Sequence, residues 1–456
     1  MAEYQNEAKR MKMDNGVEVL HNGKDSSSTN TNLCASIIHK LYLDEKTADI
    51  HFSFGANGIE RVPAHKLILS TGSNVFETMF HGSLPEGDVV NIVSGDSSAF
   101  KEFLQFFYLD DITMTSDNIA QVINFVQQYG IERCMVQCID FLKNTMTNND
   151  VCKAYHLALQ FNLDDLKRFC ERKISGNAED VLKTDDFLNC DRTVLQHILK
   201  MDSLLCEETN IFDACIAWAK KSCEKKGQDA GIVKNLRKQL SGEMRFIHFR
   251  RMKFEDFVSR NAEYFDLFSI TDVRDILQII ANKEFKSDLF TTKPLSYEIF
   301  TWDEKRVFEC SLSDKLRPGF DPFRQTKDSF TFSCNKPLLL KRIKLAKVKF
   351  TRQAIFGRDS RDPDTIKIDL FQIYHGKFTE ESLFKANFCM SSEEDIFVEF
   401  DKPIIIHPKR SYKIVMSSAH NGQFNIATAN GTVELGALQI MFNGCGLVSA
   451  MFFNRI

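Results

Sequence analysis

DIHFSFGANGIERVPAHKLILSTGSNVFETMFHGSLPE, residues 49–86, is the stretch that decides the fold of the first part of this chain. Its residues 49–54 alternate between apolar and polar side chains, which is the period of a β-strand with one buried face. Residues 55–58 are rich in glycine and asparagine and predict a turn, after which 59–63 return as a second strand. The stretch therefore begins with a β-hairpin.

A short helix is expected next, after a break in the pattern at 70–73. Ser73 lies directly before this helix, and a serine there caps a helix by accepting hydrogen bonds from its first backbone N–H groups. Apolar side chains at spacings of one, three and four residues form one face, which must be buried: Val75, Phe76, Met79 and Phe80.

Four features of this region resemble the BTB/POZ domain, a protein-interaction fold: a strand beginning at Ala48, the string Pro63-Ala64-His65-Lys66, Ser70, and the helix from Phe76 to Phe80. His65 has no Cys, Asp or Glu partner at the spacing of metal ligands. In this family the histidine is structural. The resemblance therefore implies a structural role for His65, in preference to catalysis or metal binding.

The composition predicts several domains and protein partners. A chain of 456 residues is too long for one ordinary core, and 43% hydrophobic with 26% charged residues is typical of globular proteins. A net charge of -4 argues against nucleic acid or an anionic membrane as partner, because both need clustered positive charge. No apolar run approaches the roughly 20 residues that span a bilayer, so we expect a soluble protein.

The 13 cysteines predict reduced thiols rather than disulfides. Their number is odd, no Cys-x-x-Cys occurs, and the polar first residues do not resemble a secretory signal. These features indicate a cytoplasmic or nuclear protein. Cys134 and Cys138 share a helix face and are expected to be core thiols, with zinc ligation as the alternative.

The beginning of the chain predicts a tail and then a helix. Residues 1–32 are polar and are expected to be a disordered N-terminal tail. Leu33, Ile37 and Leu41 then follow at four-residue intervals, as on one face of a helix. In the BTB fold the helix at this place packs against its two-fold mate, so the resemblance implies a homodimer with these three residues at the interface. A helix packed only on its own core is the alternative.

Leu84-Pro85-Glu86 directly follows the helix that carries Phe80. The tripeptide is similar to the pattern of a hydrophobic residue, any residue and glutamate that occurs in BTB domains that bind cullin-3. The resemblance implies that Leu84, Pro85 and Glu86 form a cullin-binding site, in which the leucine enters a groove and the carboxylate meets its polar rim. An ordinary surface loop is the alternative.

Helical patterns fill the rest of the first half. Strands followed by helices at 97–109, 118–129 and around 134–142 agree with a BTB domain over 33–147. Residues 148–285 have a purely helical pattern.

The residues 148–285 resemble the BACK domain, which follows BTB in many cullin-3 adaptors. The resemblance rests on the order of the segments 151–166 and 211–219 and on Met244-Arg245-Phe246. The run 245–254 interleaves basic with aromatic side chains, as a platform for single-stranded nucleic acid would. Because the BACK pattern expects an Arg-Phe and a loop there, the nucleic-acid interpretation is not preferred.

The last part of the chain changes to the period of β-structure. Residues 286–296 are polar and predict a linker, and 297–456 contain many short alternating stretches between turn residues, which predicts an all-β sandwich. The segment 400–414 is similar to a strand-turn-strand segment of the PHR domain, so the sandwich is expected to be PHR-like. The basic run 341–350 predicts a solvated lysine face on a strand, which is also our candidate surface for reading a substrate; an acidic-partner site is the alternative.

The predicted fold class is therefore α+β: a BTB/POZ domain, an all-α BACK domain and an all-β sandwich. No nucleophile–base pair, phosphate-binding loop, zinc spacing or carboxylate pair stands out, so we expect no enzyme, cofactor or metal. The architecture resembles substrate-recognition adaptors of cullin-3 ubiquitin ligases. In such an adaptor the BTB domain dimerises and binds cullin-3, and the sandwich binds a protein substrate, here unidentified.

Two alternatives remain open. One is a scaffold or transcriptional co-regulator that uses its BTB domain only to oligomerise, with no cullin contact. The other is an enzyme with its site in the sandwich, for which the sequence offers His375, His407 and His420 but no acid that can be placed beside them.

Overall fold

The computed structural model of this chain describes residues 33–55, 60–93, 95–109, 112–312, 328–345, 365–374, 377–378, 382–389, 396–408, 410–418, 427–428, 431–446 and 448–456. The predicted disordered tail at 1–32 and residues 56–58 of the predicted hairpin turn lie outside these residues, as do His375 and His420 of the enzyme alternative.

Two compact units make up the chain. The first comprises Met1–Thr147 and Ala154–Lys167, and the second comprises Asn148–Lys153 and Arg168–Ile456. The domain boundaries expected from the sequence stay predictions. Within the described residues, no helix is both long enough and apolar enough to cross a membrane.

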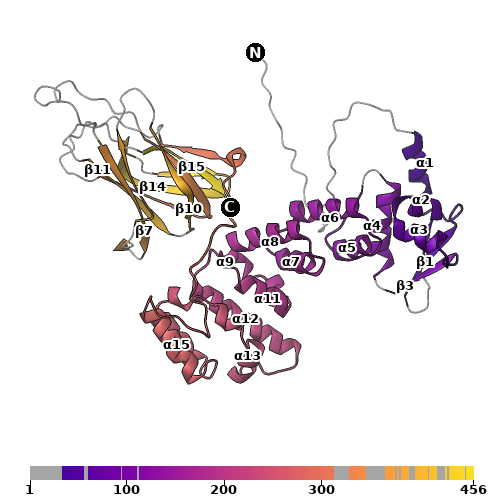
Figure 1. Cartoon of the computed structure of the whole chain (residues 1–456), viewed down its shortest axis with the longest axis horizontal. Helices are drawn as coiled ribbons and strands as arrows, with labels where there is room; N and C mark the ends of the chain where they lie inside the picture. Colours follow the sequence, from indigo (N-terminus) through magenta and orange to yellow (C-terminus); the bar gives the residue numbers. More distant parts are fainter. Residues whose placement is uncertain are drawn as a thin grey trace, which may run out of the picture. The chain divides into compact units, whose positions relative to one another are not determined.

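Helices lie beside a three-stranded sheet in the first unit (Figure 1). Its elements are α1 (Leu33–Leu41), β1 (Ile50–Phe54), β2 (Glu60–Ala64), α2 (Lys66–Gly72), α3 (Asn74–His81), β3 (Val89–Ile92), α4 (Ser97–Tyr108), α5 (Ile119–Gln128) and α6 (Glu132–Thr145). Strand β1 lies between β2, its antiparallel hairpin partner, and β3, which runs parallel to it. The hairpin and the three helices predicted at 97–109, 118–129 and around 134–142 are confirmed.

The break expected at 70–73 is wrong at its start, because α2 continues to Gly72. The hydroxyls of Ser70 and Thr71 donate to the carbonyls one turn back, at 2.6 Å to Lys66 and 2.6 Å to Leu67. These bonds let two polar residues remain in the helix. Only one residue, Ser73, separates α2 from α3.

An aromatic core joins the sheet to the helices of this unit. The Phe76 ring stacks on Tyr129 with centroids 4.1 Å apart, and the Phe52 ring lies 4.7 Å from Phe100. All four rings are buried. Ser73 fixes this arrangement, since its hydroxyl accepts from the Phe76 N–H at 3.3 Å and donates to the Tyr129 carbonyl at 2.7 Å. The predicted cap at Ser73 is therefore confirmed, as is the burial of Phe76 and Phe80, whereas Val75 is 40% exposed and its predicted burial is wrong.

His65 has structural partners. Its backbone N–H donates to the Tyr108 hydroxyl at 2.9 Å, and its Nδ1 lies 3.1 Å from the same oxygen. Its Nε2 lies 2.9 Å from the Thr47 hydroxyl. His65 thus ties the end of β2 to α4 and to the segment before β1.

Tyr108→Phe is expected to destabilise the sheet by about 1–3 kcal/mol, because it leaves the buried His65 N–H without an acceptor. Native-state hydrogen exchange of the β1 amides in the full chain measures this opening free energy. The matched control is Tyr42→Phe, which removes a hydroxyl that donates to the Lys101 carbonyl at 2.9 Å inside α4. That carbonyl keeps its helical donor, so a smaller loss is expected; equal losses would contradict the assignment.

Helices follow one another from residue 151 to residue 281, as the sequence predicts. They are α7 (Val151–Gln160), α8 (Asp164–Gly176), α9 (Ala178–Val181), α10 (Asp185–Asn189), α11 (Arg192–Leu199), α12 (Glu208–Lys225), α13 (Val233–Gln239), η1 (Glu243–Phe246), η2 (Phe249–Arg251), α14 (Phe254–Glu263) and α15 (Ile270–Ala281). A capping box at Ser269 and Asp272 begins α15.

The segment after α15, residues 282–303, contains no helix or strand, as a linker should, and is called the strap below. It is nevertheless hydrogen-bonded along the helices. The Thr291 N–H donates to the Arg245 carbonyl at 2.9 Å, and the Ser296 N–H donates to the Asp202 carbonyl at 2.9 Å. The strap is therefore an attached part of the second unit rather than a free tether.

Side chains also hold the strap. The Arg250 guanidinium donates to the Phe285 carbonyl at 2.6 Å and to the Thr292 carbonyl at 3.2 Å. The Phe290 ring is buried, 5.5 Å from the Phe249 ring. Phe290 within the polar segment 286–296 was the sequence signal for this packing, and our linker prediction did not use it.

Glu208, at the start of α12, is a buried carboxyl group with 3% of its surface exposed. It accepts from the His248 N–H and from Arg251, each at 3.3 Å. Burial raises its pKa to about 7, although the Arg251 guanidinium acts in the opposite direction. A carboxyl group with a raised folded-state pKa adds stability below its ordinary pKa of 4.5, and this stability is lost as pH rises through about 7.

Glu208→Gln is expected to remove this pH dependence. Relative to the variant, the unmodified chain should lose about 2 kcal/mol of unfolding free energy between pH 5 and pH 8. Urea titrations at the two pH values measure the difference. Glu255→Gln is the control, because Glu255 is exposed and is not among the charges that shift the Glu208 pKa, so it should give a curve parallel to that of the unmodified chain. Parallel curves for Glu208→Gln would contradict the prediction.

Antiparallel strands in two layers form the predicted β-sandwich, which is confirmed (Figure 1). Its strands are β4 (Phe308–Ser311), β5 (Asp328–Cys334), β6 (Leu338–Leu345), β7 (Thr365–Tyr374), β8 (Lys377–Phe378), β9 (Phe384–Cys389), β10 (Ile396–Ile406), β11 (Ser411–Ser418), β12 (Ala427–Thr428), β13 (Gly431–Leu435), β14 (Leu438–Gly446) and β15 (Val448–Arg455). One sheet has the order β10-β6-β15-β4 and the other β12-β14-β5-β11-β7-β8, with β13 beside β14 and β9 beside β7.

Residues of both sheets meet in one hydrophobic core. Ile343 and Met451 of the first sheet and Ile368 and Ile414 of the second are all fully buried in it. Along β11 the buried Tyr412, Ile414 and Met416 alternate with half-buried residues, as on a strand with one face on the core, whereas on β7 Asp369 is buried together with its neighbours.

The segment 400–414 is a strand-turn-strand, as predicted, but its two strands do not pair. Strand β10 pairs with β6 in one sheet, whereas β11 pairs with β5 and β7 in the other. The turn between Ile406 and Ser411 therefore crosses from one layer to the other. Here the His407 N–H donates to the Tyr412 hydroxyl at 2.8 Å.

The solvated lysine face expected on β6 is wrong for its described residues. Lys341 is only 17% exposed and donates to the carbonyls of Phe400 at 2.6 Å and Asp401 at 3.1 Å. Arg342 lies 3.7 Å from Glu399. Strand β10 thus supplies carbonyl oxygens and the Glu399 carboxylate to these cations, which alternation along β6 alone cannot reveal. The part of the run from 346 to 350 lies outside the described residues.

Candidate protein-interaction surfaces

Helix α1 presents an apolar stripe that its own unit does not cover. Leu33 is 73% exposed and Ile37 is 50% exposed, while Leu41 is half-buried. No residue of α1 is buried. Because large apolar side chains grouped on one face are unfavourable in water, this stripe is a candidate for contact with another protein surface.

The loop after α3 presents Leu84 to solvent. Leu84 is 91% exposed, and Pro85 and Glu86 are exposed as well. The Glu86 N–H donates to the Met79 carbonyl at 2.9 Å, which folds the loop back onto the last turn of α3. The leucine and the carboxylate therefore project from a loop that is anchored at both ends.

Gly82 permits this close fold of the loop. Its N–H donates to the Thr78 carbonyl at 2.9 Å, and a Cβ at this position would lie 2.3 Å from the same oxygen. Any larger residue would displace the helix end and the loop with it. The geometry can present one apolar side chain beside one negative charge to a partner.

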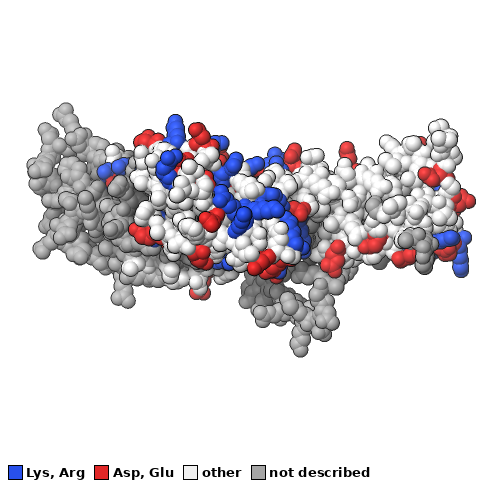
Figure 2. Space-filling model, turned by 90° about the horizontal axis from the view of Figure 1, so that it is seen from below, with Lys and Arg blue, Asp and Glu red and all other residues white. Residues whose placement is uncertain are grey.

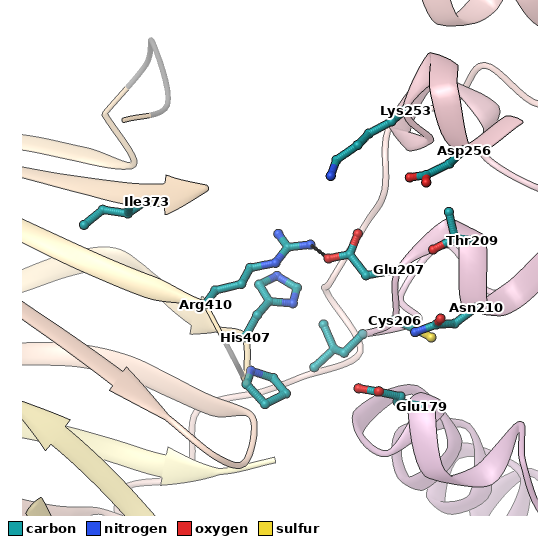
Figure 3. A pocket seen from close by; sticks show the side chains of 12 residues that line it. Glu179, Cys206, Glu207, Thr209, Asn210, Lys253, Asp256, Ile373, His407 and Arg410 are labelled. Carbon is teal, nitrogen blue, oxygen red and sulfur yellow. Dashed lines mark hydrogen bonds and ion pairs between the residues drawn. The ribbon is translucent and has the colours of Figure 1, made fainter. Parts of the chain in front are cut away.

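A cavity of about 380 Å³ lies in the second unit beside the turn that crosses between the two sheets. Figure 3 shows its charged lining: Arg410 of the turn meets Glu207 at 2.8 Å, and Lys253 and Asp256 come from the other side. Both signs of charge are present, so the cavity, called the turn cavity below, suits a polar peptide segment better than an apolar ligand.

His407 lines the turn cavity without being charged. Its ring packs edge-on against Tyr297 at 5.9 Å. Burial, together with Arg410 and Arg251, lowers its pKa to about 3. Its contacts are structural at neutral pH, and the two other histidines of the enzyme alternative lie outside the described residues.

Cys134 and Cys138 are buried on α6. Burial raises the pKa of both thiols to about 12, so both stay protonated at neutral pH. The prediction of core thiols is confirmed. Over the described part of the chain, no cluster of three His, Cys, Asp or Glu side chains is arranged to hold a metal ion.

Two family models match the chain. The model of the BTB/POZ domain matches residues 38–146, and the model called BTB And C-terminal Kelch, or BACK, matches residues 151–246. The chain therefore contains a BTB/POZ domain followed by a BACK domain. The described strands after them form a β-sandwich, for which the PHR-like assignment stays a prediction.

The relatives that this chain matches include proteins named BTB/POZ domain-containing protein 3 and 6. It is 28% identical over 239 residues to human BTB/POZ domain-containing protein 3. The matched residues make up 52% of this chain and 45% of that protein. It is 29% identical over 238 residues to BTB/POZ domain-containing protein 6 of Xenopus laevis, which is 52% of this chain and 45% of that protein. The match thus covers less than half the length of these relatives.

Among solved structures, the BTB domain of zebrafish PATZ1 is matched over its whole length and over 26% of this chain. The sequence identity is 19% and the TM-score is 0.22. At this TM-score the match adds nothing to the two family models.

Proposed function

We propose that this chain is a substrate-recognition adaptor of a cullin-3 ubiquitin ligase. The BTB/POZ and BACK domains support an adaptor, and the observation that carries the cullin contact is the 91% exposed Leu84 beside the exposed Glu86. In this proposal Leu84, Pro85 and Glu86 contact cullin-3. Burying a leucine side chain in a groove contributes about 2 kcal/mol, and a carboxylate at the rim adds charge-assisted hydrogen bonds.

The proposed adaptor is a homodimer. The α1 stripe of Leu33, Ile37 and Leu41 would pack against the same stripe of a second chain, which removes apolar surface from water on both copies. Two linked copies raise the effective concentration of substrate-binding sites without new contacts. Catalysis belongs to other subunits of the ligase.

The C-terminal sandwich is proposed to bind the substrate protein. With Lys341 and Arg342 paired inside the sheet, the turn cavity beside Arg410 replaces the lysine face as the candidate surface. Its mixed charges favour a polar segment of the substrate.

Binding of the purified full-length chain to the amino-terminal region of cullin-3, measured by isothermal titration calorimetry, tests the proposal. We expect a dissociation constant of about 1 µM or tighter, which corresponds to about 8 kcal/mol. If the chain is a dimer but does not bind cullin-3 at concentrations of tens of micromolar, the result would instead support the scaffold or transcriptional co-regulator. The exposed α1 stripe is compatible with that alternative as well.

A further inference from the structure

A second cavity, of about 350 Å³, lies in the helical part of the second unit. It is formed by α13, η1, the turn between α14 and α15, and the strap. We propose that this cavity, called the arginine cavity below, binds a peptide segment of a partner protein that carries a bulky apolar side chain flanked by carboxylates. The site goes beyond the adaptor function proposed above, since it uses neither the Leu84 loop nor the sandwich.

The floor of the arginine cavity is apolar. Five buried side chains line it: Leu240, Met244, Leu267, Phe268 and Phe290. Its volume falls at the lower end of the range of about 300–1,000 Å³ typical of ligand pockets. Such a floor accepts one leucine- or phenylalanine-sized side chain and gains the free energy of removing it from water.

Two arginines form its charged wall. Arg237 and Arg245 are both exposed. Arg237 donates to the Asp266 carbonyl at 3.4 Å, and among the described residues no carboxylate pairs with either guanidinium. Asp272, which also lines the cavity, is engaged by the N–H of Ser269 at 2.8 Å and by its hydroxyl at 2.7 Å. Both guanidinium groups can therefore take carboxylates from a ligand.

The surface around the cavity is positive. Residues 220–245 contain eight Lys and Arg against three Asp and Glu, although the whole chain has a net charge of -4. Lys225 and Lys226 donate to neutral oxygens, those of Asn189 and Gln239. Figure 2, seen from the side on which α13 lies in Figure 1, shows Lys and Arg side chains gathered in this part of the surface. This field attracts an acidic segment before it docks.

The arginine cavity is preformed in the chain without a ligand. The backbone N–H of Thr291 in the strap donates to the Arg245 carbonyl at 2.9 Å. This hydrogen bond fixes the backbone that carries the arginine. Gly242 has φ of 122°, a conformation that favours glycine, and it sets the turn between α13 and η1. A preorganised site loses little conformational entropy on binding.

A peptide fits these observations better than a nucleic acid. A single-strand platform needs exposed aromatic faces on which bases stack. In the basic-aromatic run 245–254, Phe249 is fully buried, and Phe246 is half-buried with Lys200 above its ring at 5.1 Å. Phe254 is 52% exposed but does not line the cavity. The nucleic-acid alternative therefore lacks its stacking surface around the cavity.

Selection from a displayed library of random dodecapeptides on the full-length chain tests the proposal. We expect enrichment of peptides that carry Leu, Ile or Phe with Asp or Glu nearby. The most enriched peptide, labelled with fluorescein, should bind the variant Arg237→Gln with Arg245→Gln at least tenfold more weakly, which equals about 1.4 kcal/mol. Both arginines are exposed, so the variant should keep its fold, as circular dichroism would check.

Lys225→Gln with Lys234→Gln is the matched control, because it removes two positive charges nearby but none from the cavity wall. This control should reduce the affinity for the peptide less than threefold. The affinity for cullin-3 should be the same in all variants. Equal weakening by control and double arginine variant would overturn the site, as would enriched peptides without acidic residues. Binding of a fluorescein-labelled oligothymidylate that depends on the two arginines, without peptide enrichment, would also overturn it.

Discussion

Replacing Leu84 and Glu86 together with alanine is expected to reduce cullin-3 binding by a factor of about 100 or more while the chain stays folded and dimeric. The leucine contributes about 2 kcal/mol through burial in a groove, and a hydrogen bond to the carboxylate contributes about 1.5–3 kcal/mol. Each factor of ten corresponds to about 1.4 kcal/mol. Since Leu84 is 91% exposed, its removal leaves no cavity in the unit itself. Titration calorimetry with the cullin-3 amino-terminal region measures the loss.

The matched control is Ser83→Ala in the same exposed loop, which removes neither the apolar side chain nor the charge. It should bind cullin-3 as the unmodified chain does. If the double variant kept its affinity, the loop would be an ordinary surface loop and the proposed contact would be wrong. If Ser83→Ala lost affinity to the same extent, the loop conformation rather than the two side chains would carry the binding.

Replacing Leu33 and Ile37 together with glutamate is expected to convert the dimer to a monomer. Both side chains are more than one-third exposed in the single chain, so the folded unit should lose less than about 0.5 kcal/mol. In a dimer they would be buried, and each carboxylate taken from water without a partner costs several kcal/mol. Leu41 is left unchanged, because it is half-buried against its own unit. Sedimentation velocity at micromolar concentration should show half the native mass.

Lys46→Glu is the control for this variant, since it changes charge at an exposed position that follows α1 and lies outside the stripe. Its mass should remain that of the dimer. If the unmodified chain sediments as a monomer, the proposed homodimer is wrong. A double variant that stays dimeric would mean that another surface forms the interface.

The sequence alone determined those features that depend on near neighbours in the chain. The hairpin of β1 and β2 follows from alternation and a glycine turn, and the cap of α3 follows from Ser73 directly before an apolar helix face. The same local periodicity separated the helical segment from the β-sandwich. The exposed positions of Leu33 and Leu84 were expected from the family resemblance, and their role in binding stays a proposal.

Only the tertiary structure decided which distant residues meet. Lys341 donates to two carbonyls of β10, about 60 residues further along the chain. Arg237 and Arg245 share a cavity because the strap and the start of α15 close it. Strands β10 and β11, adjacent in sequence, separate into different sheets. Periodicity reports which side of an element faces the core, but it carries no information on which side chain of another element lies opposite. Ion pairs and cavities depend on that second fact, so they emerge only when the elements are packed.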